Sequence, residues 1–107
     1  MAKPAHRPLG YRSSWEEQYA EHLKALKTAG TIQSWAYEAV RLRIADKGVY
    51  TPDFMVVTPD EIQMHEVKGQ RREAGMVRLR TAAHQHRWAR FFLVTKTRGN
   101  WVIEEVA

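Results

Sequence analysis

Apolar positions recur at helical spacing over residues 13–30. Positions three and four residues apart lie on one face of an α-helix, and the face they form here consists of Glu16, Tyr19, Ala20, Leu23 and Leu26. Ser13 is suited to cap the amino end, with Glu16 three residues later as in a capping box, and Gly30 is suited to end the helix. The pattern predicts an amphipathic helix whose apolar face contains one acid.

Apolar runs and alternations in the rest of the chain predict β-strands. The predicted strands occupy residues 34–44, 49–57, 62–68, 90–97 and 101–106. A second, basic helix is predicted over residues 75–89. The last two strands are expected to form a hairpin around Arg98-Gly99-Asn100.

This order of helix, three strands, helix and two strands predicts a mixed sheet with helices packed on it, an α/β or α+β fold. Residues 13–107 are expected to form a single domain, preceded by a loose basic arm at residues 1–12. A chain of 107 residues can bury one modest hydrophobic core.

The second and third predicted strands are joined by Thr58-Pro59-Asp60-Glu61, and this loop sets their register. If these residues form the turn, Val57 faces Ile62 and Asp53 faces Glu66. Directly opposed residues of an antiparallel pair have Cβ atoms about 4.5–5.5 Å apart and share a face. Two acids are therefore predicted to lie side by side on one face of the hairpin.

The face that carries these acids also carries Lys68 and an apolar group, which consists of Met55, Val57, Ile62 and Met64. Side chains of alternate residues in a strand point to the same face. We expect this face to pack on the first helix, which would bring Glu16 to the two acids.

Two carboxylates held this close repel each other, and burial adds to the unfavourable free energy. A divalent cation would offset it, because Mg²⁺ takes oxygen ligands and needs only one or two carboxylates beside substrate phosphates. Asp53, Glu66 and the backbone carbonyl of Val67 are the candidate ligands. The ion would polarise a phosphodiester and acidify a water, while Lys68 positions that water or stabilises developing negative charge.

Simpler interpretations stand beside this one. Glu16 either binds the water or a second ion, or it closes the capping box with Ser13. Asp53, Glu66 and Lys68 either serve a metal or form a cross-strand salt bridge, which is a poor source of stability in a small core. Glu38 either lines the same pocket or pairs with an arginine.

The distribution of charge changes the picture further. The net charge is +5, and residues 44–67 contain five acids and one base, whereas residues 68–98 contain nine bases and one acid. An acidic pocket beside a basic surface suits a polyanion that is handled with a divalent cation. The chain contains no cysteine, which excludes disulfides and thiolate metal sites. No apolar run approaches the roughly 20 residues that span a bilayer, so we expect a cytoplasmic protein without a membrane partner.

Three motifs together resemble those of the PD-(D/E)XK nuclease superfamily: Glu16 in "SSWEEQY", Asp53 in "YTPDF" and Glu66 with Lys68 in "EVKG". More narrowly, the chain is similar to small phage and prophage nucleases of the endonuclease-I-like, Holliday-junction-resolvase type. The likeness covers nearly all of residues 13–97. It implies a restriction-endonuclease-like αβββαβ core and makes residues 13–107 a nuclease domain.

The resemblance also implies an activity, namely Mg²⁺- or Mn²⁺-dependent cleavage of DNA that leaves a 5′-phosphate and a 3′-hydroxyl. Asp53, Glu66 and Lys68 would have the roles given above, with Glu16 as a further catalytic residue. The protein is expected to act inside the bacterial host of a phage or prophage.

Residues that follow the third predicted strand are the candidates for nucleic-acid binding: Gln70, Arg71, Arg72, Arg78 and Arg80. Such basic side chains bind backbone phosphates. The short loops leave little material for base readout in the major groove, so we expect recognition of junctions or branches, or weak specificity. A homodimer would place two sites on two strands. A monomeric nickase is the alternative, and RNA is a further candidate substrate.

A second hypothesis belongs to a different functional class. The chain would be a catalytically inactive nucleic-acid-binding or phage-assembly module with the same fold. In that case the substitution Lys68→Ala would leave DNA processing unchanged, whereas charge reversal at Arg78 and Arg80 would impair function.

Overall fold

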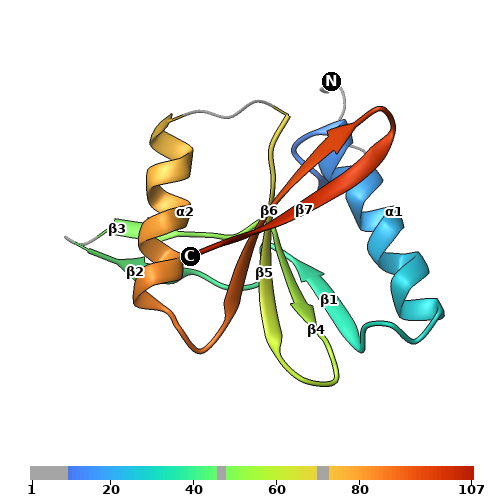
Figure 1. Ribbon diagram of the computed structural model, residues 1–107, viewed down its shortest axis with the longest axis horizontal. Coiled ribbons are helices and arrows are strands. Elements are labelled where there is room, and N and C mark those ends of the chain that lie inside the picture. The colour runs from blue at the N-terminus through green and yellow to red at the C-terminus, as the bar shows by residue number, and fades with distance from the viewer. Residues whose placement is uncertain (1–9, 46–47, 70–72) are drawn as a thin grey trace.

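The computed structural model describes residues 10–45, 48–69 and 73–107 (Figure 1). The elements within these residues are, in chain order, α1 (Ser14–Thr28), β1 (Ser34–Tyr37), β2 (Leu42–Ile44), β3 (Gly48–Tyr50), β4 (Phe54–Val57), β5 (Ile62–Val67), α2 (Glu73–Gln85), β6 (Arg90–Thr97) and β7 (Asn100–Val106). Neither α1 nor α2 is long and apolar enough to cross a membrane.

Five strands form one mixed sheet in the order β1-β4-β5-β6-β7. β4 runs antiparallel to both β1 and β5, β6 runs parallel to β5, and β7 runs antiparallel to β6. The connection between β5 and β6 contains α2, because parallel neighbours need a crossover rather than a tight turn. β2 and β3 form a separate antiparallel hairpin beside α2 (Figure 1).

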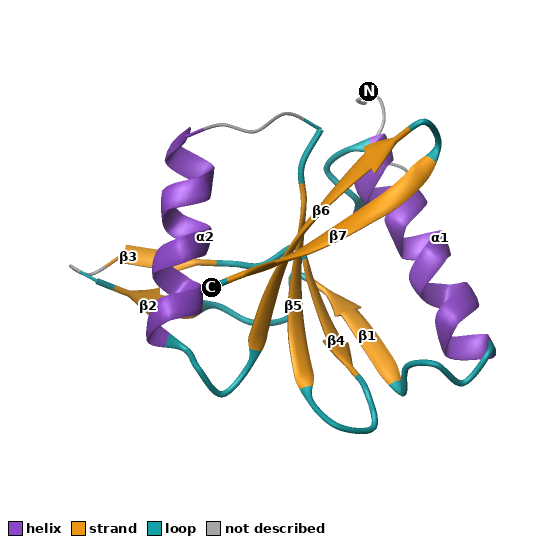
Figure 2. Ribbon diagram, in the orientation of Figure 1, coloured by secondary structure: helices purple, strands orange, loops and turns teal. Residues whose placement is uncertain are grey.

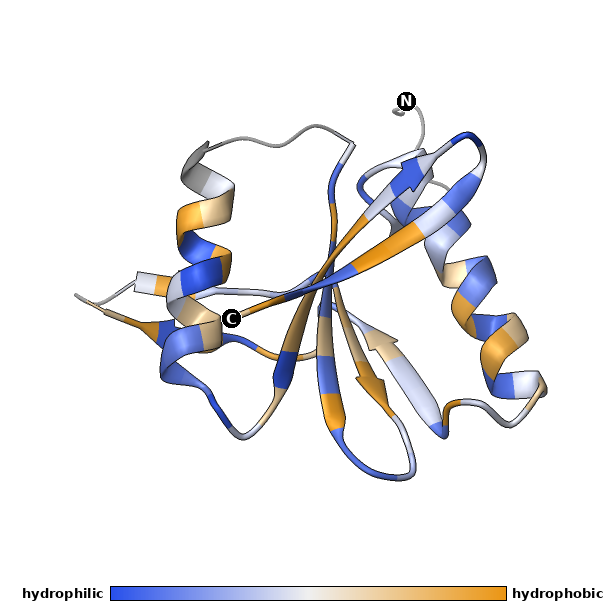
Figure 3. Ribbon diagram, viewed as in Figure 1, coloured by the Kyte–Doolittle hydropathy of each residue, from blue (hydrophilic) through white to orange (hydrophobic). Residues whose placement is uncertain are grey.

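The two helices cover opposite faces of the sheet (Figure 2). Tyr19 and Leu23 of α1 pack in one buried cluster with Phe54 of β4. Leu79 of α2 packs in another cluster with Met64 of β5. Figure 3 shows hydrophobic residues on the central strands and on part of each helix. The prediction of a mixed sheet flanked by helices is confirmed in this form.

The hairpin of β4 and β5 has the predicted register. Val57 lies opposite Ile62, and the ladder continues to Phe54 opposite His65. Thr58 closes the turn, since its backbone N–H donates to the carbonyl of Glu61 at 2.9 Å. Asp53 therefore immediately precedes the paired residues of β4.

The prediction of continuous strands at 34–44 and 49–57 was wrong, because each of these segments is interrupted. The strand expected at 34–44 is divided at Glu38, which adopts a left-handed φ of 47° between β1 and β2. The strand expected at 49–57 is divided at Pro52, between β3 and β4. Pro52 has no N–H to donate to a ladder. Alternation along a strand does not indicate which sheet it joins, and here β2 and β3 leave the main sheet.

The expected packing of the acidic face was also wrong. Met55 and Met64 point toward the cluster that contains α2, not α1. Phe54 and Val56, on the opposite face of β4, contact the residues of α1 instead. Both faces of β4 are apolar, as in strands that are covered on both sides, so the pattern alone could not assign a helix to either face.

The amino end of α1 agrees with its predicted cap, because the Ser13 hydroxyl accepts the N–H of Glu16 at 3.1 Å. Gly30 follows the carboxyl end with a φ of 85°, which suits glycine. Tyr11, which we placed in the basic arm, is buried in the same cluster as α1. Residues 1–9 of the arm lie outside the described residues.

A buried hydrogen bond ties α1 to the sheet. The Tyr19 hydroxyl donates to Nδ1 of His65 at 2.6 Å, and Nε2 of His65 donates to the side-chain oxygen of Gln63 at 2.8 Å. Burial lowers the pKa of His65 to about 4. The ring is therefore neutral, with one nitrogen that accepts and one that donates.

We expect Tyr19→Phe to lower the free energy of unfolding by about 1–2 kcal/mol, because it leaves a buried ring nitrogen without a donor. Urea denaturation at neutral pH measures the difference. Tyr11→Phe is the matched control, since the Tyr11 hydroxyl makes no hydrogen bond within the part of the chain that the structure describes. Equal losses in the two variants would contradict a specific role for the Tyr19–His65 bond.

Candidate functional site

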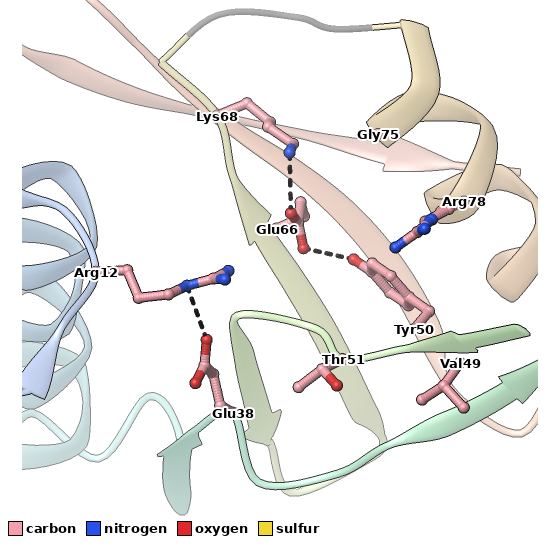
Figure 4. Close-up of a pocket in the computed structure, with 9 residues that line it drawn as sticks. All are labelled: Arg12, Glu38, Val49, Tyr50, Thr51, Glu66, Lys68, Gly75 and Arg78. Carbon is pink, nitrogen blue, oxygen red and sulfur yellow. Dashed lines mark hydrogen bonds and ion pairs between the residues drawn. The ribbon is translucent and has the colours of Figure 1, made fainter.

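One pocket is lined by four of the polar residues singled out in the sequence, namely Glu38, Glu66, Lys68 and Arg78. It has a volume of about 430 Å³, and Figure 4 shows that its walls come from segments far apart in the chain. The lining residues are Arg12, Glu38, Val49, Tyr50, Thr51, Glu66, Lys68, Gly75 and Arg78. Both Glu66 and Lys68, predicted as catalytic, are among them. Asp53 is not a lining residue and is almost fully buried, with 1% of its surface exposed.

Asp53 is held from one side only. Its Oδ2 accepts the backbone N–H of Val67 at 2.8 Å, which joins the start of β4 to the end of β5. Its Oδ1 is buried and has no hydrogen bond. Among the residues that the structure describes, Arg12 is the base beside this oxygen, with its Nη2 3.6 Å away. At that distance the pair is electrostatic and not a hydrogen bond.

Glu66 is buried and has two partners. Its Oε1 accepts the hydroxyl of Tyr50 at 2.5 Å, and its Oε2 lies 3.3 Å from Nζ of Lys68 (Figure 4). No role was predicted for Tyr50, although this residue stands in the "YTPDF" motif. The hydroxyl and the ammonium together fix the orientation of the Glu66 carboxylate.

The carboxylates of Asp53, Glu66 and Glu16 are close enough to affect one another electrostatically, as the sequence predicted. Burial raises the pKa of Asp53 to about 8, and the charges of Glu66 and then Glu16 contribute in the same direction. The N–H of Val67 and the charge of Arg12 oppose this rise but do not cancel it. Burial followed by the charge of Glu66 also raises the pKa of Tyr50, so Tyr50 remains a hydrogen-bond donor at neutral pH.

Glu16 lies beside the pocket and does not line it. Its carboxylate accepts the Tyr37 hydroxyl at 2.7 Å and the backbone N–H of Arg12 at 2.9 Å. The capping box is therefore not completed in its usual form, because Glu16 binds the N–H of Arg12 and not that of Ser13. The helix does not cover the acidic face as we expected, and Glu16 acts on Asp53 through its charge.

The predicted nucleic-acid-binding residues separate into three groups. Arg78 lines the pocket. Arg80, two residues further along α2, lines other hollows near the end of β7. Gln70, Arg71 and Arg72 lie outside the described residues. Successive positions on a helix point in different directions, so one helix cannot direct both Arg78 and Arg80 into the same pocket.

Glu38 satisfies both of the interpretations left open for it. It lines the pocket, and its Oε2 lies 3.1 Å from Nε of Arg12. Arg12, which we had assigned to the basic arm, is thus part of the site.

Gly75 makes room for Lys68. A Cβ atom at position 75 would lie 3.0 Å from Nζ of Lys68 and 3.4 Å from its Cε. This close approach places the lysine ammonium against the first turn of α2, across the pocket from Arg12 (Figure 4). No signal in the sequence distinguished Gly75 from an ordinary helical residue.

The donor set fits a hard divalent cation that is shared with a substrate. Within residues 10–45, 48–69 and 73–107, no group of three acidic or histidine side chains converges to hold an ion alone. Asp53 and Glu66 offer two carboxylates, and Mg²⁺ commonly takes one or two carboxylates together with waters and substrate phosphates. The unpartnered Oδ1 of Asp53 is the observation that points to a cation, because buried carboxylate oxygens normally have a partner.

Comparison with known proteins finds no matching family model, no significantly similar curated protein and no significantly similar solved structure. The resemblance to PD-(D/E)XK nucleases therefore stays a prediction. Function has to be inferred from the chemistry of this pocket.

We expect Asp53→Asn to flatten the dependence of stability on pH in metal-free solution. The folded-state pKa of Asp53 is about 8, above its unfolded value of about 4. The contribution of Asp53 to the free energy of unfolding is therefore fully present below its unfolded pKa. It is lost as the pH rises through about 8, by up to about 1.4 kcal/mol per pH unit. Thermal unfolding in EDTA between about pH 6.5 and pH 8.5 measures this slope in wild type and variant.

That pH window avoids an opposing contribution from His65, whose pKa is lowered from 6.5 to about 4. Stability from a group with a lowered pKa is lost as the pH falls, here below about 6.5. A wild-type Tm that stays parallel to that of Asp53→Asn across the window would show that Asp53 is already ionised without a net electrostatic penalty.

Proposed function

We propose that the protein is a metal-dependent endonuclease that hydrolyses phosphodiester bonds in DNA. The observation that carries this proposal is the buried Oδ1 of Asp53, which lacks a hydrogen bond. It lies 3.6 Å from Nη2 of Arg12, which lines the same pocket as Glu66 and Lys68. A protein gains no stability from such an atom. A divalent cation bound by Asp53 and Glu66 accounts for it.

Each residue of the site has a distinct role in this proposal. Asp53 and Glu66 hold the ion, with the backbone carbonyl of Val67 as the third ligand that the resemblance implies. When bound, Mg²⁺ or Mn²⁺ supplies Lewis-acid chemistry by polarising the phosphodiester and acidifying a water. Lys68 holds that water or stabilises the developing charge, and the hydroxyl of Tyr50 keeps Glu66 oriented.

The topology supports the restriction-endonuclease-like core. Along the main sheet the chain runs α1, β1, β4, β5, α2 and β6, which is the αβββαβ order implied by the resemblance. The β2–β3 hairpin then counts as an insertion between the first and second core strands, and β7 as an extension at the edge.

Substrate preference follows from the walls of the pocket. Lys68 and Arg78 line it with positive charge, which suits backbone phosphates in any sequence. We therefore propose DNA chosen by structure, such as junctions or branches, or with weak specificity. Two strands would be cut by a homodimer, and the setting would be the cytoplasm of a phage or prophage host.

An inactive binding or assembly module is the second candidate, and one observation favours it. Glu66 already pairs with Tyr50 and Lys68, and Asp53 pairs with Val67 and Arg12. Such a network could persist for its contribution to the fold after catalysis was lost. The two candidates make opposite predictions for Lys68.

We expect Lys68→Ala to reduce cleavage by roughly a hundredfold or more, as for other charged groups that stabilise the transition state. DNA binding should be nearly unchanged, because a single contact is lost. The measurement is cleavage of labelled duplex, single-stranded, flap and four-way-junction DNA with Mg²⁺, Mn²⁺ or EDTA, with RNA as competitor.

Lys27→Ala is the matched control, because Lys27 lies in the last turn of α1 and does not line the pocket. Cleavage that needs metal, survives in this control and disappears in Lys68→Ala supports the nuclease. Binding of DNA without cleavage of any substrate would favour the inactive module.

Gly75→Ala is expected to separate stability from activity. The new methyl group would lie 3.0 Å from Nζ of Lys68, so the ammonium must move. Because alanine favours the helix over glycine by about 0.5–1 kcal/mol, urea denaturation should show equal or higher stability while cleavage falls. Unchanged cleavage would show that the catalytic position of Lys68 does not depend on Gly75.

A further inference from the structure

Arg12 is the basic residue of the pocket most closely surrounded by acids. Its Nε lies 3.1 Å from Oε2 of Glu38, and its Nη2 lies 3.6 Å from Oδ1 of Asp53. Its backbone N–H donates to Glu16 at 2.9 Å. Figure 4 shows the guanidinium extending into the pocket toward Glu66, with Arg78 on the opposite side.

The position of Arg12 is specified by its surroundings, although 57% of its side-chain surface is exposed. Glu38 adopts a left-handed φ of 47°, a conformation that is uncommon for residues other than glycine and persists where neighbours hold it. The neighbour here is Asp53, whose backbone carbonyl accepts the N–H of Glu38 at 2.8 Å. Asp53 therefore holds Glu38, the first acidic partner of Arg12, and is itself the second.

The contact between Arg12 and Asp53 is electrostatic and long. At 3.6 Å it is too long for a hydrogen bond, so the guanidinium shields the carboxylate without satisfying it. A divalent cation at Asp53 would meet a positive charge a few ångströms away, and like charges at that separation repel strongly even in a partly aqueous site. The ion and the guanidinium therefore compete for one carboxylate.

If the guanidinium of Arg12 left Asp53, a substrate phosphate in this pocket could take the place of the carboxylate. Arg12, Lys68 and Arg78 approach the same cavity from three segments of the chain. A bound divalent ion would neutralise Asp53, one of the two acids beside Arg12, and a phosphate of the substrate would then offer the guanidinium another negative charge. Guanidinium binds phosphate through paired hydrogen bonds, which Asp53 does not provide.

We propose that Arg12 is a displaceable counter-cation. It pairs with Glu38 and Asp53 in the free protein, competes with a divalent metal for Asp53, and binds a backbone phosphate of the nucleic acid once the metal is in place. This inference rests on the proposed metal-dependent function, and it adds a residue that the family resemblance does not supply.

The test compares Arg12→Gln with wild type in two binding experiments on the full chain. Without DNA, titration calorimetry with Mn²⁺ should give a Kd lower by roughly fivefold or more in the variant, within the usual range of coupling between two sites. With DNA, the comparison is made in a Lys68→Ala background with Mn²⁺ and a labelled four-way junction. There Arg12→Gln should weaken binding and reduce the salt dependence by about one phosphate contact.

Lys27→Gln is the control, because it removes the same charge from the far end of α1. Lys27 lies 11 residues beyond Glu16 in sequence, or about 16 Å along the helix. It should change neither affinity. Mn²⁺ affinity that is equal or weaker in Arg12→Gln overturns the inference, and so does tighter Mn²⁺ binding with unchanged binding of the junction.

Failure of this inference is distinguishable from failure of the proposed function. If wild type binds Mn²⁺ through Asp53, as judged by loss of binding in Asp53→Asn, and Arg12→Gln binds no more tightly, only the inference fails. If neither wild type nor Arg12→Gln binds Mn²⁺, the metal site itself fails and the inference with it. Binding by Arg12→Gln alone would support the competition directly.

Discussion

The hydrogen bond from the N–H of Val67 to the carboxylate of Asp53 is the interaction on which the site depends. It joins the start of β4 to the end of β5 at a buried position, 2.8 Å between donor and acceptor. The backbone carbonyl of the same aspartate accepts the N–H of Glu38. One residue therefore connects the two central strands to the point where the chain leaves β1. The break between β1 and β2 lies at this junction.

Electrostatics opposes that arrangement. Burying Asp53 near Glu66 and Glu16 raises its pKa, because the ionised form is unfavourable in a buried site beside other acids. The chain compensates with donors from separate segments, namely Tyr50, Lys68 and Arg12. None of them completes the hydrogen bonding of Asp53. A strongly raised pKa of this kind is typical of functional sites, and the cation that we propose would supply the missing partner of Asp53.

The topology of the sheet explains why these groups can meet in a cavity. β5 has an antiparallel neighbour on one side and a parallel neighbour on the other, so the chain must leave the sheet after β5 and return through α2. Lys68 continues the pairing with β6 by donating its N–H to Val94 while its side chain reaches Gly75 in α2. The β2–β3 hairpin supplies Tyr50 from the remaining side. The pocket thus lies where the main sheet, its crossover helix and the hairpin adjoin.

The sequence by itself determined the features that depend on near neighbours. The cap of α1 at Ser13, the pairing of Val57 with Ile62 and the last hairpin follow from periodicity and turn chemistry, which act over a few residues. The register in turn predicted that Asp53, Glu66 and Lys68 lie near one another. The mixed sheet with two helices followed from the order of these local elements.

The tertiary structure alone decided which helix covers which face and which strands leave the main sheet. Because β4 is apolar on both faces, its pattern suited either helix, and α2 covers the face that we had assigned to α1. Arg12, Tyr50 and Gly75 entered the site through contacts with residues far from them in the chain. Such contacts depend on how whole elements pack, and no short-range pattern of residue types specifies them.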